Sequence, residues 1–260
     1  MGFLTDFMRE LPLYLLSLPV VLMALSIHES AHGYAAYRLG DPTARNLGRI
    51  TLNPVKHFDL LGFLSMLVFH IGWAKPVPIN SRYFQNPRRD MAITGAAGPL
   101  SNLCLAVIHL LILRVGMIFI SDVFYDEVAA YSFALLTGSS FTGSMAMTVT
   151  ALILYMLYMG VIMNVVLTIF NLIPIPPFDG SRIFYAFLPP KWYFGVMKYE
   201  RIIMLVFIFL FFLGFLNGPL QIAEDWLINS LFTITGMSKG TTDWNILNWM
   251  LIYIQDLIAL

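Results

Sequence analysis

The chain has 260 residues, of which 58% are hydrophobic and 12% are charged, and its formal net charge at pH 7 is zero. Soluble globular domains carry about 25% charged residues, so this composition excludes an ordinary soluble domain. The balanced charge speaks against a nucleic-acid partner, and the single cysteine, Cys104, excludes an intrachain disulfide. Apolar runs long enough to span a bilayer recur along the chain, which predicts an all-α polytopic membrane protein.

The first expected helix covers residues 11 to about 39 and is long enough to cross a bilayer with some tilt. The N-terminus lacks the basic region and the small-residue cleavage site of a signal peptide, so we expect this helix to be retained. Its C-terminal part contains His28-Glu29-Ser30-Ala31-His32. Positions four apart lie on the same helix face, so the two histidines can bind one metal ion together.

Glu29 lies beside these histidines and can take a proton from a metal-bound water. Two neutral imidazoles, a carboxylate base and an open coordination position are what zinc-assisted hydrolysis needs. The alternative is a pair of histidines that only pack between helices, next to an incidental glutamate. Because the surroundings are apolar, three ionisable side chains are costly there unless they have a function. The pattern therefore favours a zinc site.

Arg38 indicates how deep this motif lies. An α-helix rises about 1.5 Å per residue, so His32 lies roughly 9 Å and His28 roughly 15 Å from Arg38 along the axis. If Arg38 marks the water boundary, the site lies below the membrane surface. The following loop is basic, which is typical of the cytoplasmic side, so we expect the site nearer that side of the cell membrane.

The apolar run over residues 58–73 is only about 16 residues long, short for a full crossing. Basic residues flank it on both sides, and a single crossing would put one flank on the wrong side of the membrane. We therefore expect a re-entrant segment. Because Pro76 and Pro78 cannot donate to a central ladder, any strand over residues 74–86 is expected to be an edge strand or a small membrane-associated β-hairpin.

Further spanning helices are expected over residues 92–120 and 144–173 and from residue 202 onward. The loop over residues 121–143 has acidic residues but no Lys or Arg, which suits the non-cytoplasmic side. The tail forms either interfacial helices or one more crossing. The expected total is about five to six transmembrane helices.

A third metal ligand is expected from elsewhere in the chain, because a catalytic zinc site usually has three protein ligands. Asp179 is the best candidate, since it follows Pro174, Pro176 and Pro177, which stop the preceding helix. An extended segment at membrane depth is tolerated only where it is buried or lines a wet cavity. Asp179 could instead cap a short helix that begins at Gly180, but its position at the same end as the histidine pair favours metal ligation.

Three motifs together resemble the site-2 protease family of intramembrane zinc metalloproteases, peptidase family M50. They are His28-Glu29-x-x-His32, Gly98-Pro99-Leu100-Ser101-Asn102 and Asn171…Pro174…Asp179-Gly180, in the family's order. The likeness covers roughly residues 12 to 190, and the stretch from Gly48 to Asn86 is similar to the compact bacterial branch. The family's PDZ and CBS modules have no counterpart here.

The resemblance implies that His28, His32 and Asp179 bind one Zn²⁺ per chain and that Glu29, activating a zinc-bound water, is the general base. It implies cleavage of peptide bonds in or near the transmembrane segments of membrane proteins. We expect residues 1–218 to form the metalloprotease core and residues 219–260 to form C-terminal interfacial or transmembrane helices.

Two further roles are expected near the motifs. Asn171 and Asn102 are candidate donors to the oxyanion, because each is an amide in a largely apolar helix; the alternative for both is interhelical hydrogen bonding. Residues 76–79 are candidates for a substrate clamp that pairs with an unwound strand, and they comprise Pro76, Val77, Pro78 and Ile79. Their alternative role is to close the site.

The expected partners are a transmembrane-helix substrate and the lipid bilayer, and the sequence does not predict an oligomeric state. A catalytically inactive pseudoprotease that only binds transmembrane segments is one alternative function, although such a protein would be expected to lose Glu29 or a ligand. A metal or proton transporter is another, but it would need polar groups on both halves of a pathway.

Overall fold

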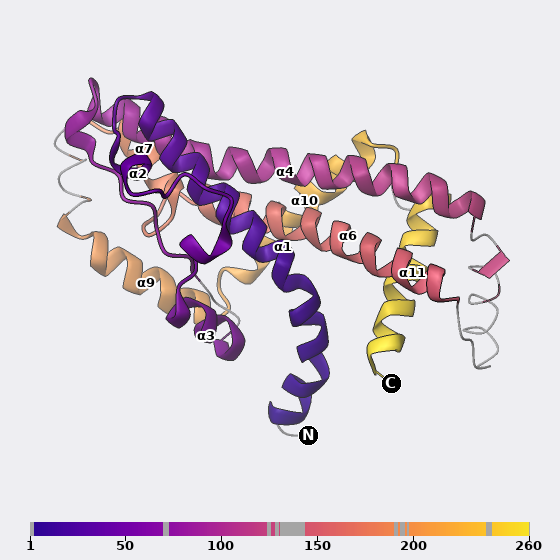
Figure 1. Ribbon diagram of the computed structural model, residues 1–260. Helices are drawn as coiled ribbons and strands as arrows, with labels where there is room; N and C mark the ends of the chain where they lie inside the picture. The colour runs from indigo at the N-terminus through magenta and orange to yellow at the C-terminus, as the bar shows by residue number, and fades with distance from the viewer. Residues whose placement is uncertain are drawn as a thin grey trace. The chain divides into compact units, whose positions relative to one another are not determined.

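The computed structural model describes residues 3–69, 73–123, 126, 127, 130, 144–189, 192, 196, 198–237 and 241–259. Regular structure in this part of the chain is entirely helical, which confirms the predicted all-α class. Two 3-10 turns are present, η1 (Pro54–Lys56) and η2 (Ser81–Tyr83). The helices, labelled in Figure 1, are α1 (Phe3–Arg38), α2 (Thr43–Asn46), α3 (Leu60–Phe69), α4 (Pro87–Val123), α6 (Met145–Leu172), α7 (Asp179–Phe187), α9 (Glu200–Phe212), α10 (Asn217–Ile234) and α11 (Thr242–Ala259).

Three of the described helices contain stretches long and apolar enough to cross a membrane. These stretches are Leu15–Arg38 of α1, Pro87–Phe119 of α4 and Met145–Leu172 of α6. The chain is therefore a membrane protein with three candidate spans, fewer than the five to six expected. The other expected crossings fall on α9, α10 and α11. α9 has 13 residues, whereas a crossing needs about 20. α10 carries two acidic residues, Glu224 and Asp225, in its middle.

The chain folds as two compact units, each built from several stretches of sequence. One comprises Met1–Val21, Leu105–Met163 and Trp226–Leu260. The other comprises Leu22–Cys104 and Asn164–Asp225, and it contains every site residue predicted from the sequence, so we call it the site unit. The predicted division of the chain at residue 218 stays a prediction, and most of the predicted non-cytoplasmic loop over 121–143 lies outside the described residues.

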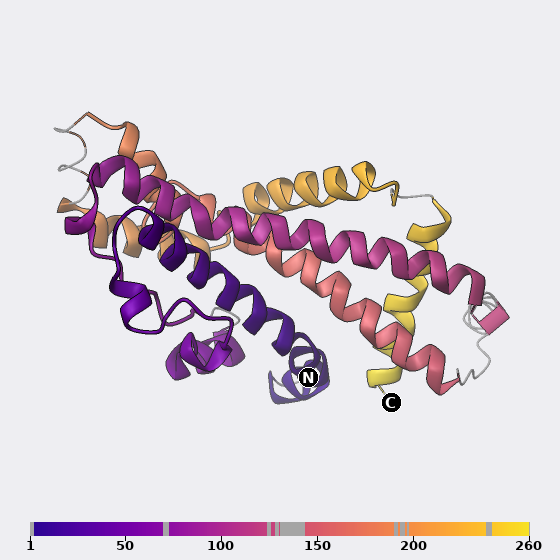
Figure 2. The same ribbon diagram turned by 45° about the horizontal axis from the view of Figure 1, so that its top comes forward.

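In the other unit, glycines let α4 and α6 approach closely. A Cβ atom on Gly160 would lie 2.4 Å from the imidazole of His109, and one on Gly116 would lie 2.6 Å from Leu154. Figure 2 shows α11 in yellow crossing beside α6, where the hydroxyls of Thr148 and Tyr253 are 2.8 Å apart. His109 is thus a packing residue.

Prolines and glycines set the ends of the helices that carry the site. α1 ends at Arg38 and is followed by Gly40, whose φ of 108° lies in the left-handed region that favours glycine. α6 ends at Leu172, just before the three prolines of residues 174–177, which have no N–H to continue the helix. The chain then turns, and α7 begins at Asp179.

The structure corrects the predicted β-hairpin over residues 74–86. No strand is present among these residues, and residues 81–83 form η2 instead. The physical reason lies in where the backbone donors go. The N–H of Val77 donates to Glu29 and that of Asn80 donates to Asp41, so side-chain carboxylates take the place of a neighbouring strand. The predicted re-entrant path of residues 58–73 stays a prediction.

Candidate metal centre

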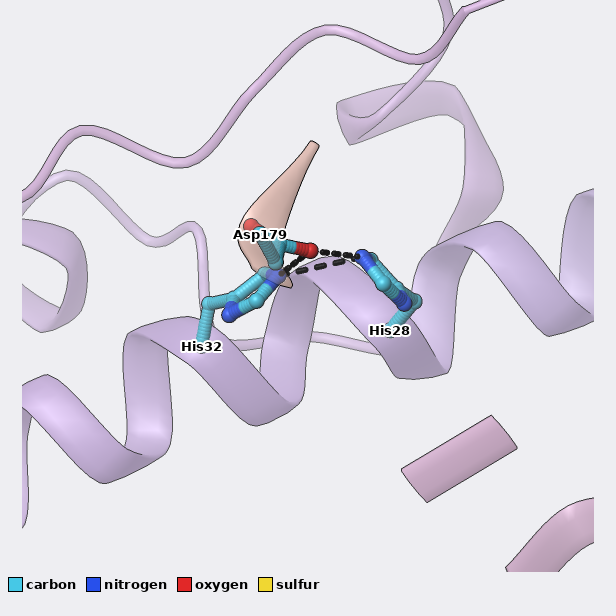
Figure 3. A group of neighbouring side chains, drawn as sticks. All are labelled: His28, His32 and Asp179. Atoms are coloured by element: carbon cyan, nitrogen blue, oxygen red, sulfur yellow. Dashed lines mark hydrogen bonds and ion pairs between the residues drawn. The ribbon is translucent and has the colours of Figure 1, made fainter. Parts of the chain in front are cut away.

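Three side chains of the site unit converge on one point, as Figure 3 shows. The Nε2 atoms of His28 and His32 lie 3.0 Å apart, and each lies 3.1 Å from Oδ2 of Asp179. The two histidines come from neighbouring turns of α1 and are buried, while Asp179 comes from the first residue of α7. The three residues are thus a group that could hold one metal ion.

The spacing of the three donor atoms fits zinc. Zinc–nitrogen and zinc–oxygen bonds of roughly 2.0–2.1 Å at tetrahedral angles separate the donor atoms by roughly 3.3 Å. The observed separations of 3.0–3.1 Å differ from this value by only a few tenths of an ångström. Two imidazoles and one carboxylate are also a donor set that catalytic zinc uses.

Asp179 contributes its carboxylate to this group instead of capping a helix. The cap position of α7 is Phe178, and it makes no side-chain cap hydrogen bond. Burial alone would raise the pKa of the Asp179 carboxyl, but the hydrogen bonds with His28 and His32 outweigh it and hold that pKa below its usual range. A carboxylate that stays ionised is what a metal ligand must be.

Oxygen acceptors set the tautomer of both imidazoles. Nδ1 of His28 lies 2.5 Å from Oδ1 of Asn102, and Nδ1 of His32 lies 2.7 Å from the backbone oxygen of Thr94. An acceptor at Nδ1 favours the tautomer that carries its proton there, which leaves the Nε2 lone pair for a metal. Asn102 is fully buried and donates in turn to Oδ1 of Asn164, 2.8 Å away.

Gly98 of α4 lies directly against the imidazoles. A Cβ atom there would lie 2.4 Å from Nε2 of His32 and 2.6 Å from Cε1 of His28. Small residues such as Gly95 and Gly98 are typical of faces where membrane helices pack closely. Only a residue without a side chain lets α4 pass this close to the metal-binding atoms.

Replacing Gly98 with alanine is therefore expected to weaken zinc binding at least about tenfold, the effect typical of disturbing the support of metal ligands. The imidazoles cannot move aside without breaking their hydrogen bonds to Asn102 and Thr94. Competition with a fluorescent chelator would measure the affinity. Gly218→Ala is the control within the site unit, because no atom lies within 4 Å of a new Cβ there; equal affinities of the two variants would contradict the packing argument.

Glu29 follows His28 on α1 but is not one of the three converging residues. Its Oε2 accepts a hydrogen bond of 2.8 Å from the backbone N–H of Val77. The carboxylate is partly exposed and is held by the segment that the sequence predicts as a substrate clamp. Val77 itself is 7% exposed, so this part of the segment packs against the protein in the described conformation.

The two candidate oxyanion donors make different contacts. Asn102 faces His28 with its oxygen, and its amide nitrogen donates to Asn164 and, at 3.4 Å, to the backbone oxygen of Ala24. The structure therefore uses Asn102 to support an imidazole. Asn171 donates to the backbone oxygen of Leu167, 2.9 Å away, and its role toward an oxyanion stays a prediction.

Sequence reasoning missed several supporting residues. His57 is 2% exposed, and its Nε2 lies 2.9 Å from the backbone oxygen of Thr51. Asp41 is fully buried. Asn164 carried a usable signal, because an amide within an apolar run is costly unless it has a partner.

Comparison with known proteins gives the class of this fold and site. Residues 17–216 match peptidase family M50, and the chain belongs to this family. It is a zinc metalloprotease, and Zn²⁺ is its cofactor.

Similar proteins carry the same description. The chain is 37% identical over 191 residues to the "Putative zinc metalloprotease YwhC" of Bacillus subtilis, a match that covers 74% of this chain and 77% of that protein. It is 32% identical over 175 residues to the "Putative zinc metalloprotease Rip2" of Mycolicibacterium smegmatis, covering 65% and 56% of the two chains. The Mycobacterium tuberculosis Rip2 protein is 26% identical over 223 residues, 84% of this chain and 73% of the relative. No solved structure gives a significant match.

Proposed function

We propose that this metalloprotease acts within the membrane and hydrolyses peptide bonds in or near the transmembrane segments of other membrane proteins. The observation that carries the proposal is the meeting of His28, His32 and Asp179, because the two histidines lie on a helix stretch that is long and apolar enough to cross a bilayer. A soluble protease has no need to build its metal site on such a helix.

In this proposal Nε2 of His28, Nε2 of His32 and Oδ2 of Asp179 hold one zinc ion. When bound, zinc supplies a Lewis acid that polarises the scissile carbonyl and lowers the pKa of water. Asn102 and the backbone of Thr94 keep both imidazoles in the tautomer that can bind it. Gly98 leaves room for these ligands beside α4.

Glu29 is the general base of the proposed reaction. It accepts a proton from the attacking water and passes the proton to the nitrogen of the leaving amide. The three converging ligands leave Glu29 outside the metal group, so its carboxylate is available for proton transfer. The remaining candidate donor to the oxyanion is Asn171, whose amide would have to turn away from Leu167 to reach the substrate.

We further propose that the site lies nearer the cytoplasmic side of the cell membrane and that residues 58–73 are re-entrant. α3 has only ten residues, which is too short for a crossing. The N–H of Lys75 donates to the backbone oxygen of His57 at 2.8 Å, and Gly62 of α3 allows close approach of the backbone at Trp73. The chain thus returns to where α3 began, which supports a segment that enters and leaves on one side.

The test is cleavage by the purified protein in lipid. We expect it to cut a single-span membrane peptide within or just beside the apolar segment, in the cytoplasmic half. Removal of zinc with a chelator should abolish cleavage, and added zinc should restore it. A pseudoprotease would bind the peptide without cutting it, and a transporter would move ions across the membrane of a sealed vesicle; either result without cleavage would overturn the proposal.

A further inference from the structure

Residues 75–80, which we call the strap, have no regular secondary structure and pass beside Glu29. Their sequence makes them stiff before any contact is formed. The ring of Pro76 fixes its own φ angle, and the ring of Pro78 restricts Val77 to extended conformations. Pro76 and Pro78 also lack an N–H, so Val77 contributes the single backbone donor of this Pro-Val-Pro stretch.

The strap is anchored at its first end by the backbone and by an arginine. The N–H of Lys75 donates to the backbone oxygen of His57, 2.8 Å away. The guanidinium of Arg49 donates to the backbone oxygen of Lys75 at 2.8 Å and to that of Pro76 at 3.3 Å. These bonds hold the chain just before Val77.

A buried carboxylate anchors the other end. The N–H of Asn80 donates to Oδ2 of Asp41 at 2.6 Å, while Oδ1 of Asp41 accepts from the backbone N–H of Thr43 at 3.0 Å. Asp41 is fully buried. A buried carboxylate is costly unless its hydrogen bonds are made, so this anchor is not one that opens readily.

Between the two anchors, Val77 contacts α1 with both its side chain and its backbone. A Cβ atom on Gly33 would lie 3.2 Å from Cγ1 of Val77, so the valine packs against the bare backbone of the helix one residue beyond His32. Its N–H then reaches Oε2 of Glu29 at 2.8 Å. The side-chain contact thus fixes where this donor lies.

We propose that the strap positions the general base. The Val77 N–H holds one carboxylate oxygen of Glu29 and leaves the other to face the attacking water, and Asp41 and Arg49 are positioning residues that act through the strap. The inference rests on the proposed role of Glu29. A glutamate has several rotatable bonds, so without this bond the carboxylate samples other rotamers and spends less time in the reactive geometry.

The sharpest test removes the N–H of Val77 and keeps its side chain. Replacing Val77 with α-hydroxyisovaleric acid converts its amide to an ester and keeps the isopropyl side chain. The ester also makes the carbonyl of Pro76 a weaker acceptor, and the control below changes the carbonyl of Pro54, which accepts from the N–H of His57 at 3.0 Å, in the same way. We expect kcat to fall roughly 10- to 100-fold, the scale of a misplaced catalytic group, with KM and zinc stoichiometry unchanged. The matched control is the same ester at Val55, whose N–H donates to Asn53 at 3.0 Å on an exposed turn; it should leave kcat within twofold of wild type.

Side-chain variants of Arg49 give a second, independent measurement. Arg49→Met should lower kcat at unchanged KM, and Arg49→Lys, which keeps a donor, should recover part of the loss. The proposal is overturned if the kcat of the Val77 ester is within twofold of the wild-type value or above it. It is also overturned if the Val77 ester loses no more kcat than the Val55 ester does. A failure of the proposed function itself looks different, because wild type would then not cleave the membrane peptide at all. If Glu29→Gln keeps full cleavage, Glu29 is not the general base and the role of the strap falls with it.

Discussion

Glu29→Gln is expected to lower the rate of peptide cleavage by about 10²–10⁴-fold, the typical cost of removing a general base. Loss of the proton transfer to the leaving amide adds to this effect. The substitution should leave zinc binding intact, because the converging ligand group is His28, His32 and Asp179. The glutamine oxygen can still accept the hydrogen bond from Val77, so the strap should stay in place.

Single-turnover cleavage of a single-span peptide in lipid, with zinc measured on the same sample, checks this prediction. Glu200→Gln is a suitable control, because it removes the same charge from an exposed residue in the first turn of α9. Wild type, Glu29→Gln and Glu200→Gln should bind the peptide with the same affinity. If Glu29→Gln cleaves at the wild-type rate, Glu29 is not the general base. If every form binds the peptide and none cleaves it, the chain is a binder of transmembrane segments and not a protease of them.

The histidine pair was predictable because its geometry is local. Two histidines four residues apart on a helix must share a face, and the proline-terminated helix before Asp179 made an ordinary helix cap the weaker alternative. The helical class followed from the apolar runs in the same way. The place of Asp179 is different, because it lies 151 residues from His28 in sequence; its prediction rested on the position of both motifs at the same end of their helices and on the family resemblance.

The failed hairpin prediction concerns pairing between distant segments. The hairpin over residues 74–86 was expected from proline spacing, but the donors of that segment bind Glu29 and Asp41, which lie 48 and 39 residues away in sequence. For Asn102 the sequence left two roles open, donation to the oxyanion and interhelical hydrogen bonding, and its contact with His28 depends on the close approach of α1 and α4 at Gly98. A pattern within one segment cannot show which carboxylate or imidazole another segment brings to it.

The largest loss of metal is expected when both histidines are replaced. The His28→Ala, His32→Ala double variant should contain no tightly bound zinc, whereas wild type should contain about one ion per chain. Asp179→Asn should keep zinc with lower affinity, because a neutral amide oxygen is a weaker ligand than a carboxylate. His109→Ala is the control for loss of a histidine, since His109 packs against Gly160 in the other unit.

Thermal unfolding separates loss of the site from loss of the fold. Zinc that binds the folded protein stabilises it by mass action, so a chelator should lower the Tm of wild type and of His109→Ala. The Tm of the double variant should be the same with and without the chelator, because this variant has no zinc to lose. If the double variant instead keeps one zinc ion and its Tm falls on chelation, the metal lies elsewhere and the three converging side chains are only a packed, hydrogen-bonded cluster.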